Sequence, residues 1–547
     1  MEPTTIAALL REIGIYYDLD GDGRRAMAFE RAAKSIEAAN GLQRLIEEGR
    51  LEELPAVGPS IAKVVAELAR RGTVEVLDRL RAKWPLAIVE LSQLPKVGVQ
   101  RARKIYEAYA PRDLDAVAAL AKAGQLQQLP GFGKLSEAKI LEAIEDRRLR
   151  GQRVLLIDAE EQATSLAAHL RQAGRIDIAG PVRRAIEIVD HLAFAVAEPA
   201  LDAVVDRLAS FALVTSVDRS ARPIVGYLAT GMRVDLHVAR GFGVAQILAT
   251  GSAEHVALLR ARAADRGIDL DTLASDDEAS VYASLGLPWI PPEVRDGSDE
   301  LSGDDFSDLI TLADITAACH CHTTWSDGRA SVAEMAQAAA DLGFKLITIT
   351  DHSAAASYAG GLDAARLRAQ AAEIAALDAP VRILHGTEAD ILEDGSLDVP
   401  ADVVPELGVV IASVHQRFKL DEDRMTQRLV TAMRQPFFKV WGHALGRLVL
   451  RRDPIKVRLD DVLDAIAGSR AAIELNGDPY RLDLDPVNAR KAVARGIKFV
   501  LSSDAHSING LRAVRFAVAM ARRARVRKRD VLNALPPDEL AAAVAPR

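Results

Sequence analysis

The stretch KLITITDHS, Lys345 to Ser353, decides the fold of the C-terminal half of this chain. A short run of apolar and β-branched residues ends directly in an aspartate and a histidine, which is typical of a buried strand with polar side chains at its carboxyl end. The runs VRILHG, VVIASVH, FKVWGH, AAIELN and KFVLSS follow in order, separated by amphipathic helical stretches. This alternation predicts a parallel β/α barrel or a layered sheet.

Candidate metal ligands follow these predicted strands. In a β/α barrel the carboxyl ends of the strands meet on one face, where functional sites are assembled. Imidazole and carboxylate together suit zinc, manganese or iron better than magnesium. Neighbouring divalent ions activate water and clamp phosphate, so the set predicts phosphoester hydrolysis. The candidates are His320, His322, Asp327, His352, Glu388, His415, His443, Asp504 and His506.

The first candidates lie in CHCHTTWSDG, which also holds both cysteines of the chain. Alternate residues of a regular strand share a face, so we expect His320 and His322 to face the metals. Cys319 and Cys321 should then face away and pack as small apolar residues. A structural zinc finger needs a further ligand pair, and the chain has no other cysteine. Two neighbouring cysteines cannot build a disulfide framework, which favours a reducing cytoplasm.

The first 150 residues predict helices, with three copies of the pattern L-P-x-h-G in LPAVGPSIAKVV, LPKVGVQRARKI and LPGFGKLSEAKI. Glycine permits a tight turn, and the N-terminus of the following helix presents N–H groups that suit a phosphate oxygen. One copy would indicate only a turn in a helical bundle, whereas three favour contact with nucleic acid. The predicted phosphate and DNA contacts are Gly58, Lys63, Gly98, Arg101, Lys104, Gly133 and Lys134.

The middle of the chain predicts strands in RVLLIDA, RAIEIVDHLAFAVA, FALVTSVD and MRVDLHVA. The stretch LGLPWIPPEVRDGSDELSGDD predicts a linker, since its Pro, Gly and acid content cannot sustain a long helix or a central strand. A net charge of −8 argues against a nucleic-acid binder held by bulk charge, and the sequence predicts neither a membrane span nor a signal peptide.

The order of the hairpin repeats, GPVRRAIEIVDHLAFAV, RVDLHV, TGSAEH, GLPWIPPEVR and HCHTTWSDG resembles a bacterial family X DNA polymerase with a C-terminal PHP (polymerase and histidinol phosphatase) domain. The resemblance implies a multidomain chain with an α-helical helix-hairpin-helix region, an α+β nucleotidyltransferase-like palm and thumb, and a (β/α)7-type PHP barrel. The implied domains are an N-terminal helical DNA-binding domain at 1–80, helix-hairpin-helix fingers at 81–150, a palm at 151–238, a thumb-like domain at 239–300, a linker at 301–314 and the PHP domain at 315–547.

The palm departs from the family pattern G-S-x-R-R-G-K-E-T-x-G-D-h-D. The register set by Gly180 and the following arginine pair puts His191 and Ala193 at the positions of the paired aspartates. Asp235 remains, but one carboxylate cannot hold two magnesium ions. The position of the lyase lysine is Val64, so Schiff-base chemistry is not expected. We therefore expect polymerase activity to be lost.

The PHP resemblance implies three divalent ions, manganese or zinc, with iron as the alternative. His320, His322, Glu388 and Asp504 would hold the first; Glu388 would bridge to a second held by His415 and His443; and Asp327, His352 and His506 would hold a third. Catalytic roles are implied for His320, His322, Glu388, Asp504 and His506. Asp351 could orient a ligand, and Arg447, Lys419 or Arg417 could clamp phosphate or be surface charges.

The resemblance implies a monomeric DNA-repair enzyme that acts as a metal-dependent 3′-5′ exonuclease or phosphodiesterase on gapped or damaged DNA. Cutting at abasic sites and removal of 3′ blocks are further implied activities. Three alternatives stay open: a small-molecule phosphatase of the histidinol-phosphatase kind, a residual DNA polymerase and a non-enzymatic DNA-end scaffold. The hairpin repeats disfavour the first alternative, and the intact ligand set disfavours the last.

Overall fold

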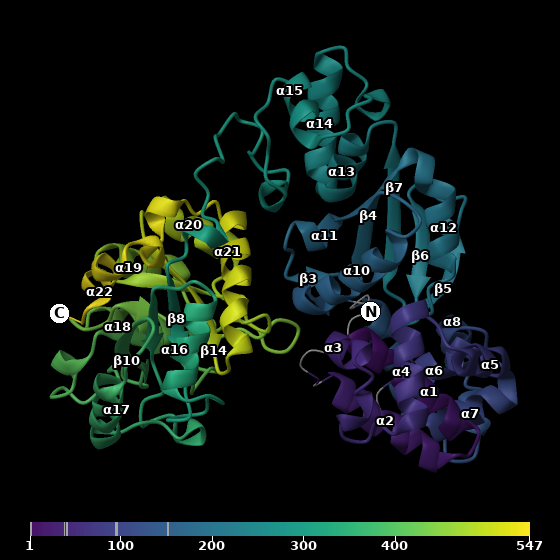
Figure 1. Cartoon of the computed structure of the whole chain (residues 1–547), viewed down its shortest axis with the longest axis horizontal. Helices are drawn as coiled ribbons and strands as arrows, with labels where there is room; N and C mark the ends of the chain where they lie inside the picture. Colours follow the sequence, from purple (N-terminus) through teal and green to yellow (C-terminus); the bar gives the residue numbers. More distant parts are fainter. Residues whose placement is uncertain are drawn as a thin grey trace. The chain divides into compact units, whose positions relative to one another are not determined.

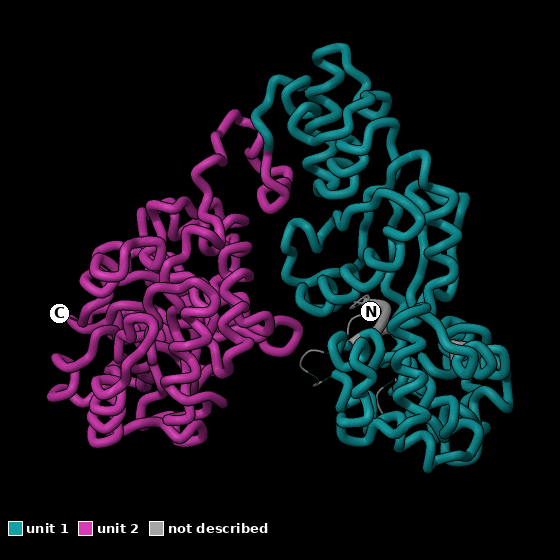
Figure 2. The backbone as a smooth tube through the Cα atoms, in the orientation of Figure 1, with its two compact units in different colours: residues 1–289 teal, residues 290–547 magenta. Residues whose placement is uncertain are grey.

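The computed structural model describes residues 3–37, 39, 42–92, 94, 97–149 and 153–546. The chain forms two compact units, residues 1–289 and 290–547 (Figure 2). The boundary falls between Trp289 and Ile290, inside the proline-rich stretch that the sequence predicted as a linker. Among the described residues, no helix is both long and apolar enough to cross a membrane.

The N-terminal part of the first unit is helical, as predicted. Each L-P-x-h-G repeat ends where a helix begins: α4 follows Gly58, α7 starts at Gly98, and α9 follows Gly133. The helices are α1 (Pro3–Leu19), α2 (Gly23–Glu37), α3 (Leu42–Glu47), α4 (Pro59–Arg71), α5 (Glu75–Lys83), α6 (Leu86–Ser92), α7 (Gly98–Tyr109), α8 (Leu114–Lys122) and α9 (Lys134–Leu149).

A five-stranded sheet with the order β2-β4-β7-β6-β5 follows, and only β4 and β7 in it run parallel. A two-residue pair, β1 with β3, lies outside it. The strands are β1 (Val154–Leu155), β2 (Ile176–Ala179), β3 (Ile188–Val189), β4 (His191–Ala197), β5 (Val214–Asp218), β6 (Ile224–Leu228) and β7 (Arg233–Ala239). The helices of this region are α10 (Leu156–Leu170), α11 (Gly180–Arg183), α12 (Leu201–Ala209), α13 (Phe242–Thr250), α14 (Ala253–Asp265) and α15 (Glu278–Ser284).

The strand prediction for RVLLIDA is wrong beyond its first residues. β1 covers only Val154 and Leu155, and helix α10 begins at Leu156. The apolar run continues at helical spacing, with Leu156, Ala159, Ala163, Leu166 and Leu170 buried on one face. This longer period outweighs the local apolar run. The other three predicted strands of this region correspond to β3 and β4, β5, and β7.

The second unit is a closed barrel of parallel strands in the order β10-β11-β12-β13-β14-β8-β9, with helices around it (Figure 1). Each apolar run predicted as a barrel strand forms one. The strands are β8 (Ala317–Cys321), β9 (Leu346–Ile349), β10 (Arg382–Asp390), β11 (Val409–Ser413), β12 (Val440–Trp441), β13 (Ala472–Asn476) and β14 (Lys498–Ala505). The helices are α16 (Val332–Asp341), α17 (Ala364–Ala376), α18 (Glu422–Met433), α19 (Leu459–Ala467), α20 (Pro486–Ala494), α21 (Val514–Arg523) and α22 (Pro537–Val544).

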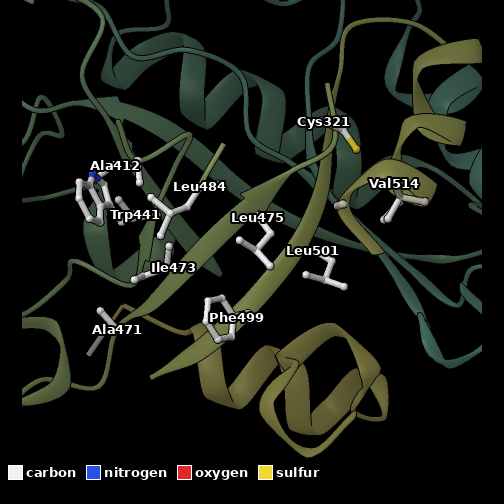
Figure 3. Close-up of a cluster of buried hydrophobic side chains, with 14 of the residues drawn as sticks. Cys321, Ala412, Trp441, Ala471, Ile473, Leu475, Leu484, Phe499, Leu501 and Val514 are labelled. Carbon is white, nitrogen blue, oxygen red and sulfur yellow. The ribbon is translucent and has the colours of Figure 1, made fainter. Parts of the chain in front are cut away.

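Two apolar layers stabilise the barrel. The inner layer gathers residues from the amino-terminal halves of the strands and includes Cys319, with Leu540 and Val544 of α22 packed against it. The outer layer lies between the strands and the surrounding helices and includes Cys321 and Val514 of α21 (Figure 3). Since apolar side chains fill the amino-terminal end of the barrel, the carboxyl end is left for polar chemistry.

The acidic stretch after the unit boundary packs against the barrel unit. Glu293, Asp299 and Asp304 form ion pairs with Arg522, Arg525 and Arg527 at 2.7, 2.5 and 3.0 Å respectively. The stretch therefore belongs to the second unit and does not form a free tether.

Candidate metal centre

A bulge in β8 directs both histidines of CHCH toward the carboxyl end of the barrel. The register of β8 slips by one residue against β9 between Ala318 and Cys321. Within this bulge His320 has a φ of 59°, in the left-handed region that non-glycine residues rarely adopt. Both histidines are fully buried and their rings lie 5.2 Å apart. The two histidines do lie close together, as predicted. The predicted reason, regular alternation along the strand, is wrong, because a bulge at His320 interrupts that alternation.

The same bulge changes the placement of the cysteines. Cys319 and Cys321 were expected on one face, but they lie in the inner and the outer apolar layer respectively. The extra residue between them reverses the pleat, so one sulfur points into the barrel and the other away from it. Both thiols are free and buried, as predicted for packing residues.

The first group of predicted ligands converges on one point. The Nε2 atom of His320 lies 3.3 Å from Oε2 of Glu388 and 3.7 Å from Oδ1 of Asp504. The Nε2 atom of His322 lies 3.6 and 3.3 Å from the same two oxygens. Two imidazole nitrogens and two carboxylate oxygens thus surround one position.

The other carboxylate oxygen of Glu388 belongs to a second group. Oε1 lies 3.2 Å from Nε2 of His415 and 2.8 Å from Nε2 of His443. The two imidazole nitrogens lie 3.3 Å apart. Because the two oxygens of Glu388 face different groups of ligands, this side chain is placed to bridge them.

A third group gathers around Asp327, in the loop that follows β8. Its Oδ1 atom lies 3.6 Å from Nε2 of His352 and 3.3 Å from Nε2 of His506. His322 also approaches this oxygen, with Nδ1 at 3.9 Å. All nine predicted ligands therefore come together at the carboxyl end of the barrel.

The chemistry of these residues fits bound cations. Within the described part of the chain, Nε2 of His320, both ring nitrogens of His322 and both carboxylate oxygens of Glu388 are buried without a hydrogen-bond partner. Buried polar atoms without partners are costly, so such a set favours a bound cation. The backbone is also strained here, since Asp504 and His443 have φ values of 51° and 21°. Strained residues cluster at functional sites.

The electrostatics of the cluster favour charged carboxylates. Burial opposes ionisation of Glu388, but His415 and His320 outweigh it and hold the pKa of this carboxyl well below its usual range. Burial likewise opposes ionisation of Asp327, but the hydrogen bond to His506 and the nearby positive charge lower its pKa to about 2. Both groups are therefore anionic ligands at neutral pH.

Two further carboxylates, which the sequence analysis missed, orient the histidines. Glu474 on β13 bonds to Nδ1 of His320, and Asp390 on β10 bonds to Nδ1 of His415. A carboxylate on one ring nitrogen fixes the tautomer and directs the other nitrogen at a metal. Two features of the sequence could have indicated these residues. Glu474 is an acid inside the apolar run AAIELN, and Asp390 follows Glu388 by two residues, on the same strand face.

Asp351 organises the loop that carries Asp327. Its carboxylate accepts hydrogen bonds from the backbone N–H and the hydroxyl of Thr323 at 2.8 and 2.7 Å, and from Gln370 at 2.6 Å. Asp351 therefore does not bond to a candidate ligand in these contacts, but holds the start of the loop on which Asp327 lies.

The guanidinium of Arg447, a predicted phosphate clamp, bonds to backbone carbonyls of a neighbouring loop. Its Nε atom donates to the carbonyl of Arg481 at 3.0 Å, and its guanidinium also bonds to the carbonyl of Leu482. Arg481 places a cation beside the cluster, with Nε 3.5 Å from Oδ2 of Asp504. The side chain of Arg417 is 69% exposed and pairs with Glu393.

The predicted DNA contacts divide into two kinds. Gly58, Gly98 and Gly133 lie in open space at helix N-termini, and Lys63 and Lys134 are exposed beside them. Arg101 and Lys104 instead connect the second repeat to the third: the Arg101 guanidinium lies 5.6 Å from the Phe132 ring, and Lys104 donates to the carbonyl of Pro130 at 3.3 Å.

At the palm positions the remaining carboxylate is paired with an arginine and the neighbouring alanine is buried. Ala193 on β4 pairs with Asp235 on β7, and Asp235 accepts a hydrogen bond from Arg233 at 2.6 Å. Ala193 is buried, and a Cβ on Gly180 would lie 2.7 Å from its methyl group.

The neighbouring charged side chains of the palm are paired as well. His191 bonds to Asp190 at 2.7 Å, and Arg183 forms a bidentate pair with Glu278 at 2.6 and 2.9 Å. The palm positions thus offer one carboxylate, already paired with an arginine, whereas two magnesium ions prefer several free oxygen ligands.

Known protein families match four parts of the chain. Residues 318–478 match the PHP domain, and residues 245–296 match the DNA polymerase beta thumb. Residues 1–74 match a helix-hairpin-helix domain, and residues 88–146 match a SAM-like helix-hairpin-helix tandem. The hairpin and thumb matches indicate DNA binding.

Three relatives are informative. The chain is 33% identical over 558 residues, covering 98% of both proteins, to a Bacillus subtilis protein named DNA polymerase/3′-5′ exonuclease PolX. A probable phosphatase of Caldanaerobacter subterraneus is 30% identical over 205 residues, which cover 34% of this chain and 74% of that protein. A probable phosphatase of Aliivibrio fischeri is 30% identical over 203 residues, which cover 35% and 78% respectively.

Proposed function

The chain belongs to the bacterial PolX family, which joins a family X DNA polymerase core to a C-terminal PHP domain, and on this premise we propose that it is a metal-dependent 3′-5′ exonuclease. The observation that carries the proposal is the contrast between two sites. Eight of the nine metal-ligand candidates form mutually close groups in the barrel and His443 lies 2.8 Å from Glu388, whereas in the palm Ala193 is buried beside an Asp235 that is paired with Arg233. We therefore assign the phosphodiesterase activity to the PHP domain and no nucleotide transfer to the palm.

Three groups of residues would hold divalent ions, manganese or zinc, with iron as the alternative. On the distances between their ligating atoms, His320, His322, Glu388 and Asp504 would form the first group; Glu388, His415 and His443 the second; and Asp327, His352 and His506 the third. Bound ions would supply activation of water and stabilisation of phosphate charge. Glu474 and Asp390 hold the tautomers of two ligating histidines, and Arg481 adds a fixed positive charge beside the cluster.

The first unit would hold the DNA. The exposed turn glycines Gly58, Gly98 and Gly133, with Lys63 and Lys134, suit contacts to the phosphate backbone that do not depend on sequence. Binding of gapped or damaged duplex, cutting at abasic sites and trimming of blocked 3′ ends belong to this proposal. In that role the protein would act in DNA repair.

A labelled-duplex assay tests the proposal. Protein loaded with manganese is incubated with a 3′-recessed duplex, with and without nucleotides, and we expect shortening that the variant His320→Ala/His322→Ala abolishes. His191→Ala, which removes a palm histidine with no assigned role, serves as the matched control and should shorten DNA like the wild type. Shortening that persists in the double variant would overturn the assigned site, and nucleotide-dependent extension would overturn the assignment of the palm.

The two phosphatase relatives favour one second candidate, a small-molecule phosphatase. Their similarity covers only about a third of this chain and does not include the hairpin repeats. Turnover of a sugar phosphate together with an untouched duplex in the same assay would establish this candidate in place of the exonuclease.

A further inference from the structure

The loop after β9 carries one large side chain at the edge of the metal cluster. It reads SAAASYAGGL from Ser353 to Leu362, and its other members are small apart from the buried Leu362. Tyr358 lies near its tip, in a 3₁₀ turn (Ser357–Ala359), and is 68% exposed. A bulky aromatic side chain left in solvent on a loop of alanine, serine and glycine suggests a binding role.

The loop is fixed in place, which distinguishes this tyrosine from a mobile surface residue. Leu362 donates to the carbonyl of His352 at 2.8 Å, so the two ends of the loop are paired. The backbone N–H of Ala355 bonds to Asp398 at 2.6 Å. A Cβ at Gly361 would lie 1.9 Å from the carbonyl of Ser353, so only glycine permits this closure. On a fixed backbone, a tyrosine has only two side-chain torsions to order and loses little conformational entropy when a ligand packs on it.

Two chemically different groups border the cluster. The Tyr358 ring lies 6.3 Å from the ring of His352, a candidate ligand of the third group. Arg481 lies beside Asp504, and its side chain keeps 21% of its surface exposed. The site thus offers a flat apolar surface and a cation next to the same metal positions.

A ligand that uses both groups needs a phosphate and a flat ring. Arginine and divalent ions suit phosphate oxygens, and an exposed aromatic ring suits a nucleobase, because every base has a π face. A sugar phosphate would leave the ring unused. A nucleotide at the end of a single strand combines both features.

We propose that Tyr358 stacks on the base of the terminal nucleotide of a single-stranded DNA end, while Arg481 binds the adjoining phosphate. This inference rests on the exonuclease function proposed above and names the residues that recognise its substrate. Tyr358 is a binding residue that sets the affinity for the strand end, and Arg481 contacts the phosphate that the cluster acts on.

The test compares two single-stranded oligonucleotides that differ only at the 3′ terminus, one with a normal nucleotide and one with an abasic tetrahydrofuran residue. For the normal end, Tyr358→Ala should lower kcat/KM about 10-fold, mainly through KM, as expected for loss of one base stack. Tyr358→Phe keeps the ring and should act like the wild type. For the abasic end, the wild type and Tyr358→Ala should act alike.

Base stacking by Tyr358 and the exonuclease activity can fail independently. A wild-type protein that shortens the 3′-recessed duplex but neither oligonucleotide overturns the stacking proposal alone, whereas one that shortens none of the three substrates overturns the exonuclease function as well. If the wild type shortens both oligonucleotides and Tyr358→Ala loses activity equally on both, or on neither, base stacking by Tyr358 is overturned and the exonuclease function stands.

Arg481→Gln is assayed on the same two oligonucleotides with its metal content measured. Both ends carry the phosphate, so activity should fall by a similar factor on each while bound metal stays at the wild-type level. Loss of metal would show that Arg481 supports Asp504 instead, and unchanged activity would remove any role. Either result overturns the phosphate assignment.

Discussion

The carboxylate of Glu474 bonds to Nδ1 of His320 and directs Nε2 of the same ring toward Glu388 and Asp504. Glu474 also accepts hydrogen bonds from the hydroxyl of Ser502 at 2.6 Å and from the backbone N–H of His443. One buried carboxylate thus positions one ligand by its side chain and another by its backbone.

Glu474→Gln should weaken metal binding by about 10- to 100-fold, the usual effect of removing a partner that orients a ligand. The amide keeps the shape but cannot accept from every donor around it. Equilibrium dialysis against manganese, with elemental analysis of the retained metal, measures the effect. Glu278→Gln alters a buried carboxylate of the first unit that pairs with Arg183, and should leave metal content unchanged. Wild-type affinity in Glu474→Gln would contradict the orienting role.

Metal loading of the chelator-treated protein should release protons. Burial lowers the pKa of His415, but Glu388 and Asp390 outweigh it and raise that pKa to about 10. His506 is similar, with a pKa raised to about 9 by Asp327 and Asp504 against the effect of burial. These imidazoles hold protons at pH 7 without metal, and only the neutral ring binds a cation.

The sign follows from the raised pKa values. Apparent affinity should increase as the pH rises from about 6 toward 9, because fewer protons must be displaced. Calorimetric titrations at pH 7 in two buffers of different ionisation enthalpy measure the protons released. Identical heats in both buffers would contradict the prediction.

The barrel was predictable because its strands are apolar runs, all but AAIELN carrying or preceding a candidate ligand, and the closed sheet forms from those runs. The positions of Cys319 and Cys321 were not, because nothing in CHCH marks the bulge that separates them. The bulge is fixed by pairing with β9 and β14, whose partner residues lie far along the chain. Local periodicity carries no information about such register shifts.

The position of Arg481 beside the cluster could not be predicted from local sequence spacing either. Arg447 follows the ligand motif GHALGR closely, which made it the natural candidate, yet its guanidinium anchors the carbonyls of Arg481 and Leu482. Sequence spacing places a residue on a loop, but the path of that loop depends on tertiary contacts. The strand prediction for RVLLIDA was wrong for a related reason: the helical spacing of apolar residues over α10 outweighs the short apolar run at its start.

Both cysteines should be dispensable for metal binding. Burial raises the pKa of the Cys319 thiol to about 12, so it is neither a thiolate ligand nor a reactive nucleophile at neutral pH. Cys319→Ala and Cys321→Ala should retain wild-type metal content, and neither native thiol should react with a disulfide reagent until the fold opens. Rapid labelling of the native protein, or metal loss in either variant, would contradict this.

The acidic stretch after the unit boundary should contribute measurably to the stability of the barrel unit. Glu293 pairs with Arg522 at 2.7 Å, and both side chains are less than a fifth exposed. Glu293→Ala should lower the free energy of unfolding by about 1–3 kcal/mol, because it leaves the largely buried charge of Arg522 without its carboxylate. Asp538→Ala removes a 96% exposed partner of Arg382 and should cost less than about 0.5 kcal/mol. Hydrogen exchange of barrel peptides across a urea series measures both, and equal effects would contradict the docking of this stretch.

Restoring carboxylates to the palm should destabilise it without creating a polymerase. Ala193 packs with Ala179 and Ala249, beneath Gly180, so Ala193→Asp would bury a charge among apolar groups opposite Asp235. This should cost about 2–4 kcal/mol, measured by the same exchange method on peptides of the first unit. His191→Asp changes a partly exposed side chain of the same strand and should cost less than about 1 kcal/mol. The double variant should still fail to extend a primer with magnesium and nucleotides, because position 193 packs among apolar side chains and Asp235 is already paired with Arg233. Primer extension by that variant would show that the site was only missing its ligands.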